Sequence, residues 1–173
     1  QIQYPTESDV ELFAFRLTPQ GETFSMTSAT ITISGVIGIT QSDLTNPRLY
    51  RDMNGDRTYD GGDVQVGGGG TLTLTGQSGT IVFSSSFGVT TTQDYILVLD
   101  VTEIRPGDQM VLSLSTSNLY GTGDLTGGVV VPAQSNLQWV QHVKNGNGGN
   151  GTGPIGGDAP AGQGTRGGGG NSG

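Results

Sequence analysis

The chain has 173 residues, a formal net charge of −8 and a sequence pI near 4.2, with 7 Lys and Arg residues against 15 Asp and Glu residues. This balance argues against nucleic acid as a partner, because a phosphate backbone requires a Lys- and Arg-rich surface, and it favours a divalent cation. The sequence contains no Cys, and no apolar run approaches the roughly 20 residues that span a bilayer, so it predicts neither disulfides nor a membrane span.

The N-terminal stretch predicts two extended segments. Residues 1–8 contain Pro5, which disfavours helix, and we interpret them as an extended segment that can act as a donor strand for a neighbouring subunit. Residues 10–18 alternate like a strand but are apolar on both faces. The first face carries Val10, Leu12 and Ala14, and the second carries Phe13, Phe15 and Leu17. This pattern predicts a strand that is buried on both sides or lies at a subunit contact.

The rest of the chain up to residue 143 predicts many short strands. Residues 29–33 alternate apolar and polar side chains, which is typical of a half-buried strand. Gly-rich turns separate the runs, and 32 of the residues are Gly. We therefore expect residues 9–143 to form an all-β sandwich of about seven to nine strands, either Ig-like or jelly-roll. Further strand-like runs lie at residues 49–50, 70–75, 80–84, 94–102, 109–115, 129–131 and 137–143.

The two ends of the chain predict a flexible tail and an extracellular location. Residues 144–173 are Gly-rich with almost no apolar side chain, so they predict a flexible tail that cannot bury a core. The sequence begins at Gln1 rather than Met, which we interpret as a mature start after signal-peptide removal, and hence as an extracellular or cell-surface location. Asn150 begins an Asn-Gly-Thr sequon, the acceptor pattern for an N-linked glycan.

One segment has the spacing of a calcium-binding loop. Residues 52–63 place oxygen-bearing side chains at loop positions 1, 3, 5, 9 and 12, and the backbone carbonyl of Thr58 at position 7. Ca²⁺ takes six to eight oxygen ligands from a flexible loop, and four carboxylates this close together repel one another without a cation. The predicted Ca²⁺ ligands are Asp52, Asn54, Asp56, Thr58, Asp60 and Asp63.

These residues resemble the calcium loop of dockerins and related EF-hand-like loops, in which position 12 is Asp. One departure is Arg57 at position 6, where such loops usually carry Gly. The wider stretch, with NPRLYRDMNGDRTYDGGDVQV followed by DYILVLDVTEIRPGDQMVLSLS, resembles an Ig-like module of large secreted bacterial surface proteins. The resemblance covers residues 9–143 and implies a calcium-stabilised structural module.

No arrangement of residues in the sequence predicts catalysis. We expect the one His, His142, to be a surface or hydrogen-bonded strand residue. Asp100 lies inside an apolar strand and needs a partner, for which Arg48, Arg51 or a backbone turn is available. Asp108 follows Pro-Gly and is interpreted as a turn residue. The chain is therefore predicted not to be an enzyme.

Two functions remain open at this point. The first is a subunit of an extracellular filament, a homopolymer whose copies complete one another's sheets by strand donation and which Ca²⁺ stabilises. Its donor segment is either residues 1–6, extending into residues 10–17, or residues 137–143 with the tail. The alternative is a carbohydrate-binding or adhesin module of a larger surface protein, with glycans as partners. That module would use Trp139 and Tyr120 as stacking residues.

Overall fold

The computed structural model describes residues 6–129 and 138–143, apart from the side chains of Gln138, Trp139 and Val143. The tail, residues 144–173, therefore lies outside the described residues. So do residues 1–5 of the N-terminal donor segment and residues 130–131 of the strand expected at 129–131. The described strands are β1 (Glu7–Leu17), β2 (Phe24–Ile37), β3 (Leu44–Arg51), β4 (Val64–Gly69), β5 (Thr71–Thr75), β6 (Ser78–Phe83), β7 (Phe87–Val89), β8 (Gln93–Val101), β9 (Gln109–Leu114), β10 (Leu119–Gly123) and β11 (Gln138–Val143). Two single-turn 3₁₀ helices, η1 (Gln41–Asp43) and η2 (Thr116–Asn118), precede β3 and β10.

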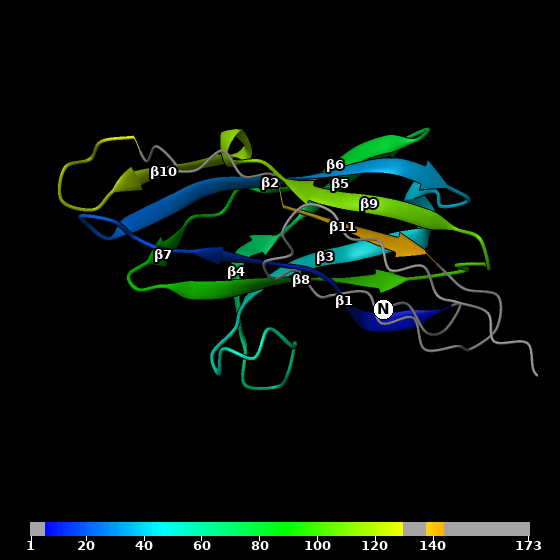
Figure 1. Cartoon of the computed structure of the whole chain (residues 1–173), viewed down its shortest axis with the longest axis horizontal. Coiled ribbons are helices and arrows are strands. Elements are labelled where there is room, and N and C mark those ends of the chain that lie inside the picture. The colour runs from blue at the N-terminus through cyan, green and yellow to red at the C-terminus, as the bar shows by residue number, and fades with distance from the viewer. Residues whose placement is uncertain (1–5, 130–137, 144–173) are drawn as a thin grey trace, which may run out of the picture.

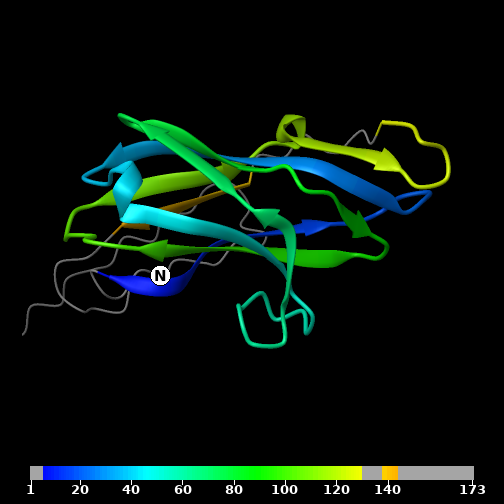
Figure 2. The same cartoon turned by 180° about the vertical axis from the view of Figure 1, so that it is seen from behind.

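The strands form two antiparallel sheets stacked as the two layers of a sandwich (Figures 1 and 2). One sheet has the order β1-β8-β3-β4, and the other has the order β11-β9-β2-β6-β5, with β7 and β10 also pairing with β2. The predicted all-β sandwich is confirmed. The described residues form eleven strands because β2 is 14 residues long and pairs with two strands in succession along each edge.

A β-bulge in β1 explains why both of its faces read as apolar. The pairing with β8 shifts register between Glu11 and Phe13, so Leu12 is an extra residue in the ladder. A bulge of this kind reverses which side the following side chains face. Val10 before the bulge, Leu12 within it, and Phe13 and Phe15 after it all enter the main core, and only Ala14 is buried on the other face. The apolar residues of β1 therefore belong mostly to one buried face. The bulge moves that face from even-numbered to odd-numbered positions, which is why the sequence suggested burial on both sides.

The main core lies between the two sheets, and a small second cluster lies on the outer face of the four-stranded sheet. The residues of β8 from Tyr95 to Leu99 are 0% exposed, because alternate side chains enter the two clusters. The outer cluster consists of Ala14, Ile96 and Val98, with Tyr50 and Tyr59 packed against it. Something must cover this outer face, and Tyr59 comes from the predicted calcium loop.

The two sheets are joined along both sides. On one side the chain passes directly from β4 to β5 through Gly70, where a Cβ atom would lie 2.8 Å from the Phe83 ring. On the other side Nε2 of His142 on β11 hydrogen-bonds the Leu12 carbonyl of β1 at 2.5 Å. Burial lowers the pKa of His142 to about 4, so the neutral ring donates this bond at neutral pH. The prediction of a hydrogen-bonded strand histidine is confirmed.

The two carboxylates singled out in the sequence have structural roles. Asp100 accepts hydrogen bonds from Arg48 Nη2 at 2.6 Å, Asn46 Nδ2 at 3.0 Å and the Asp9 amide at 3.0 Å. Arg48, one of the candidate partners, is therefore the cation that balances it. Asp108 accepts from the Arg105 amide at 2.6 Å and closes the turn before β9, as expected.

Candidate metal-binding loop

The loop at residues 52–63 connects β3 to β4 and projects from the four-stranded sheet, away from the seven-stranded sheet (Figures 1 and 2). Its first residue is fixed to β8, since the Asp52 amide donates to the Asp94 carbonyl at 3.0 Å. The Gln93 side chain in turn donates to the Asp52 carbonyl. The loop therefore begins from a rigid point on the sheet.

Asp52 organises the first half of the loop. Its side chain is 0% exposed. Oδ1 accepts from the amides of Asn54 at 3.1 Å and Gly55 at 2.6 Å, and Oδ2 accepts from the Arg57 amide at 2.7 Å. Asp and Asn favour such side-chain to backbone bonds in turns. This buried carboxylate is thus stabilised by backbone dipoles.

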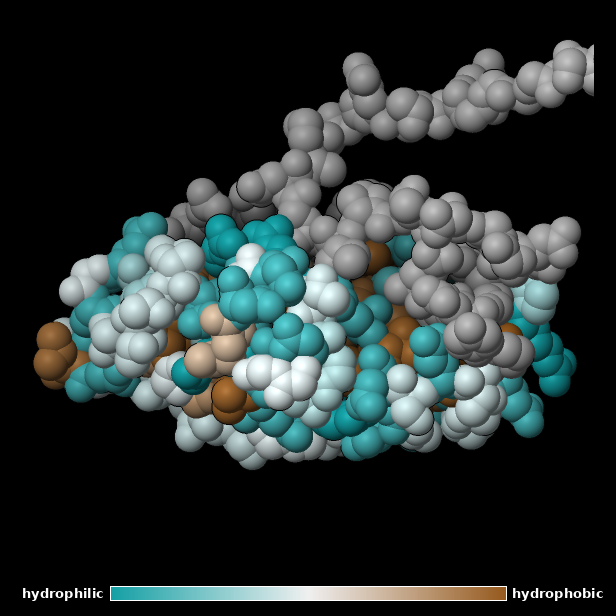
Figure 3. Space-filling view, turned by 90° about the horizontal axis from the view of Figure 1, so that it is seen from below, coloured by the Kyte–Doolittle hydropathy of each residue, from teal (hydrophilic) through white to brown (hydrophobic). Residues whose placement is uncertain are grey.

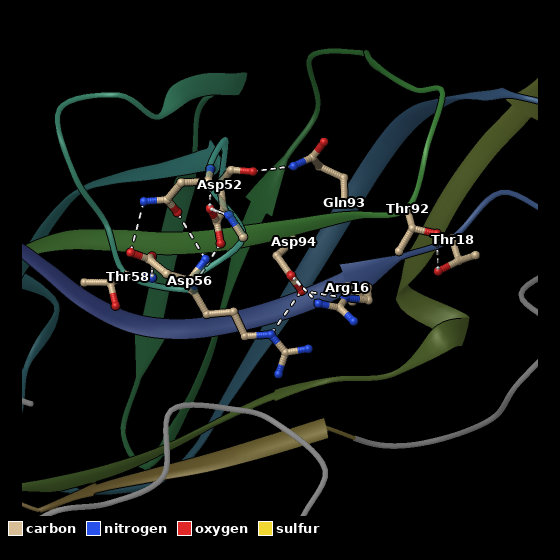
Figure 4. Close-up of polar contacts among 11 residues, drawn as sticks. Arg16, Thr18, Asp52, Asp56, Thr58, Thr92, Gln93 and Asp94 are labelled. Carbon is tan, nitrogen blue, oxygen red and sulfur yellow. Dashed lines mark hydrogen bonds and ion pairs between the residues drawn. The ribbon is translucent and has the colours of Figure 1, made fainter.

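The side chains of Asn54, Asp56 and Asp60 converge in the exposed part of the loop. Nδ2 of Asn54 donates to Oδ2 of Asp56 and to Oδ2 of Asp60, each at 3.0 Å. Oδ1 of Asn54 accepts from the Asp56 amide at 3.1 Å. A single amide group therefore lies between two carboxylates, where it supplies the positive end of a dipole. Figure 4 shows Asp56 beside Thr58, whose amide donates to Asp56 Oδ1 at 2.8 Å.

Asp63 closes the loop. Its Oδ1 accepts from the Met53 amide and its Oδ2 accepts from the Asp60 amide, both at 3.0 Å. The carboxylate thus joins the start and the end of the loop through two backbone donors. Position 12 of the predicted motif therefore holds the loop ends together in this structure.

The donor chemistry of the loop fits Ca²⁺, whereas the side-chain arrangement does not form a ligand cage. Carboxylate and amide oxygens are the ligands that Ca²⁺ prefers, and each oxygen that accepts one backbone bond keeps further lone pairs. The structure brings three predicted ligand side chains together, but through the nitrogen of Asn54. Within residues 6–129 and 138–143, no group of three or more His, Cys, Asp or Glu side chains is placed to hold a metal ion.

Arg57 occupies position 6 with a backbone φ of +61°, the left-handed region that Gly adopts at little cost. The loop therefore has the turn that position 6 requires, even without Gly. The Arg57 guanidinium reaches Asp94 Oδ1 at 3.2 Å, and Arg16 binds the same carboxylate through two contacts at 3.0 Å and 2.6 Å (Figure 4). Asp94 is only 4% exposed. This ion-pair group fastens the loop to β8 and β1, and the sequence analysis missed it.

Tyr59 covers the outer apolar cluster of the four-stranded sheet. Its ring lies 4.5 Å from the Tyr50 ring and packs on the cluster of Ala14, Ile96 and Val98. A side-chain hydrogen bond between Tyr59 and Tyr50 favours the neutral Tyr59 hydroxyl and, together with burial, raises the pKa of Tyr59 to about 12. An aromatic residue within an acidic, exposed loop was the sequence signal for this role.

Glu11 of β1 lies beneath the loop. Its Oε2 accepts from the Tyr59 amide at 3.0 Å, and its Oε1 is buried without a hydrogen-bond partner in the described part of the chain. Burial raises the pKa of Glu11, against the lowering effect of the Tyr59 amide, and nearby Asp56 and Asp52 raise it further. The Glu11 carboxyl group beneath the loop therefore favours its neutral form more than an exposed Glu does.

The aromatic residues proposed for glycan stacking are only partly described. Tyr120 on β10 is 56% exposed, while the side chain of Trp139 lies outside the described residues. The face of the molecule in Figure 3 is mostly polar, with apolar residues in small separate groups. Of the two residues proposed for an aromatic platform, Tyr120 is the one whose side chain the structure describes.

No family model and no curated protein matches this chain. In the described residues, no helix has the length and apolar character needed to cross a membrane. Function must therefore be argued from the geometry of the sandwich and its loop.

Proposed function

We propose that the chain is a non-catalytic structural subunit of an extracellular filament, in which copies exchange the N-terminal strand β1. The observation that carries the proposal is the position of β1. Among the described residues it is the most N-terminal strand, lies at the edge of its sheet and pairs with β8 alone. An N-terminal edge strand can leave its own sheet and fill the same place in a neighbour, making identical contacts in trans.

The burial of β1 makes such an exchange energetically strong. Its main-core residues are Val10, Leu12, Phe13 and Phe15, each at most 4% exposed. At about 1.5–3 kcal/mol for each large apolar side chain, this strand contributes several kcal/mol to whichever sandwich contains it. Because each subunit donates to the next, the contact does not close and produces a fibre.

Contacts at β5 and β7 favour exchange of β1 over addition of a strand at these two places. On β5 the Leu74 amide donates to the Gln41 side chain at 3.0 Å, and just before β5 the Gly70 amide donates to the Pro47 carbonyl at 2.8 Å. On β7 the Gly88 carbonyl accepts from Arg51 Nη2 at 3.3 Å. Groups occupied in this way are poor templates for a further strand. Exchange of β1 needs no free edge.

The loop at residues 52–63 supports a role for Ca²⁺ in stabilising each subunit. Its four Asp residues lie on one side of the sheet that holds β1, and Arg57 and Tyr59 connect the loop to that sheet. A cation bound by Asp52, Asn54, Asp56, Thr58, Asp60 and Asp63 would reduce the repulsion among them. We propose that Ca²⁺ stiffens the sandwich against the shear of a fibre.

The exchange of β1 can be tested with disulfides, because the chain has no Cys of its own. Leu17 on β1 and Gln93 on β8 are Cα partners in the ladder, so Leu17→Cys with Gln93→Cys locks β1 within its own subunit. The matched control is Thr73→Cys with Thr80→Cys, which locks the β5–β6 pair instead. Negative-stain electron microscopy would be carried out on both proteins, oxidised and reduced, with Ca²⁺ and with EDTA.

We expect fibres from the reduced proteins and from the oxidised control, and none from the oxidised β1 lock. Fibres that fragment in EDTA would support the role of Ca²⁺. Fibres whose oxidised β1-lock subunits run as monomers on a non-reducing denaturing gel would show that β1 is not exchanged, because a disulfide formed in an exchanged fibre would join two subunits. Isolated particles in every sample would contradict the filament and favour the glycan-binding module.

A further inference from the structure

The loop contains an exposed Asn–Gly pair, Asn54-Gly55, at its third and fourth positions. In such pairs the backbone nitrogen of Gly attacks Cγ of Asn, the Cγ–Nδ2 bond breaks, and ammonia leaves with a cyclic succinimide behind. Water then opens the ring at either carbonyl, producing Asp or isoaspartate. Gly favours this reaction because it has no side chain to obstruct the attack. Asn is also among the thermally labile residues.

The folded loop holds both reacting groups away from this reaction. The nucleophile, the Gly55 amide, donates its hydrogen to the buried Asp52 carboxylate at 2.6 Å. An anionic acceptor at this distance opposes loss of the amide proton, which the attack requires.

The electrophile is also restrained. The Asn54 side chain is bound through its Nδ2 to Asp56 and Asp60 and through its Oδ1 to the Asp56 amide. Turning the Asn54 Cγ toward the Gly55 nitrogen would break these three hydrogen bonds. We call this set of bonds the Asn54 clamp.

We propose that Asn54 is a latent deamidation site, protected by the Asn54 clamp and by the bond from Gly55 to Asp52, and modified when the β3–β4 loop opens. This inference does not depend on the filament or on Ca²⁺. Water is the only co-reactant, and Asn54 is exposed to it.

Deamidation would change the charge balance of the loop. Asn54 supplies the donor between two carboxylates, and each of its Nδ2 contacts is 3.0 Å long. An Asp at position 54 would place carboxylate oxygens there instead, so three like charges would converge. Isoaspartate would also add a methylene group to the backbone within a tight turn. The modified loop would therefore lose its present geometry unless a cation entered it.

The test is peptide mapping by mass spectrometry of the full chain after incubation at mildly alkaline pH, in native buffer with EDTA and in concentrated urea. We expect Asn54 to deamidate at least about tenfold more slowly in the native protein, which corresponds to a loop-opening free energy of about 1.4 kcal/mol or more. Equal rates under the two conditions would overturn the proposal.

A double variant separates local protection from global folding. Asp56→Ala with Asp60→Ala removes both acceptors of Asn54 Nδ2 at exposed positions, and thermal unfolding in EDTA checks that the sandwich stays folded at the incubation temperature. We expect its native deamidation rate to rise toward the rate in urea. Glu103→Ala, which removes an exposed carboxylate elsewhere, should leave the rate unchanged. A double variant that is folded and no faster than the wild type would overturn the role of the Asn54 clamp.

Discussion

Two carboxylate groups on the four-stranded sheet are stabilised in opposite ways. At the end of β8, Asp100 and Asp9 share the guanidinium of Arg48, with both ion-pair distances at 2.6 Å. In the loop at residues 52–63, the carboxylates are held mainly by backbone amides, and the Arg57 guanidinium reaches Asp94 on the sheet. Backbone amides orient a carboxylate but carry no net charge. The first group, Asp9 and Asp100 with Arg48, thus has one guanidinium for its two carboxylates. The four Asp residues of the loop are held mainly by uncharged amides, so the loop keeps a larger negative charge that a cation can offset.

The largest expected effect is on the buried end of the loop. Asp52→Ala leaves the amides of Asn54, Gly55 and Arg57 without their acceptor. We expect a loss of about 3 kcal/mol in the free energy of unfolding, since each unsatisfied buried donor costs about 1–3 kcal/mol and water can reach some of them. Urea denaturation measures this loss of unfolding free energy. Asp56→Ala is the comparison variant, and we expect a smaller loss from it because Asp56 is exposed. A loss below that of Asp56→Ala would show that Asp52 does not organise the loop.

Calcium should distinguish the two carboxylate groups next. If the loop binds Ca²⁺, a concentration one hundred times the Kd raises the unfolding free energy by about 2.7 kcal/mol. Thermal unfolding with Ca²⁺ and with EDTA measures the difference. The gain should disappear in Asp56→Asn with Asp60→Asn and persist in Asp100→Asn. A gain that both variants retain would place the ion elsewhere.

The group of Asp9, Asp100 and Arg48 should lose stability when its cation is removed. Arg48→Met keeps much of the apolar stem but leaves Asp9 and Asp100 without a counter-charge. We expect a loss of about 2 kcal/mol, discounted because Asp9 is 48% exposed and solvent screens it. Urea denaturation at neutral pH measures it, and Ca²⁺ should not restore the loss. Restoration by Ca²⁺ would contradict the distinction between the two groups.

The smallest effect is a pH dependence of the same group. Burial tends to raise the pKa of Asp100, but its bonds to the Asp9 amide, Asn46 and Arg48 outweigh burial and lower it below 3.8. The folded state therefore favours the ionised form, so this stabilisation is present above pH 3.8 and is lost as pH falls through the folded-state pKa. The stability difference between wild type and Asp100→Asn should shrink in that acidic range. A constant difference would mean that charge at Asp100 contributes nothing.

Much of the fold follows from local sequence pattern, and part of the loop does as well. Period-2 alternation and Gly-rich turns predicted the two-sheet sandwich, because side chains on a strand alternate faces whatever the strand pairs with. The spacing of Asp52, Asn54 and Asp56 predicted a calcium-binding loop, and in the structure these side chains accept hydrogen bonds from backbone amides two or three residues ahead. The need of Asp100 for a partner also followed from its apolar neighbours. These features depend on residues close together in the chain.

What only the tertiary structure decided depends on residues far apart. The bulge at Leu12 reverses which face of the sheet the following side chains of β1 point to. It exists only in the pairing of β1 with β8, so the sequence of β1 alone does not reveal it. Glu11 beneath Tyr59, and Arg16 and Arg57 on Asp94, join segments separated by dozens of residues. A local pattern states which side chains must be buried or paired, whereas the identity of the partner is set by how the sheets stack. The sequence by itself therefore determined an all-β chain with an acidic loop, and packing decided that the loop lies over the strand β1.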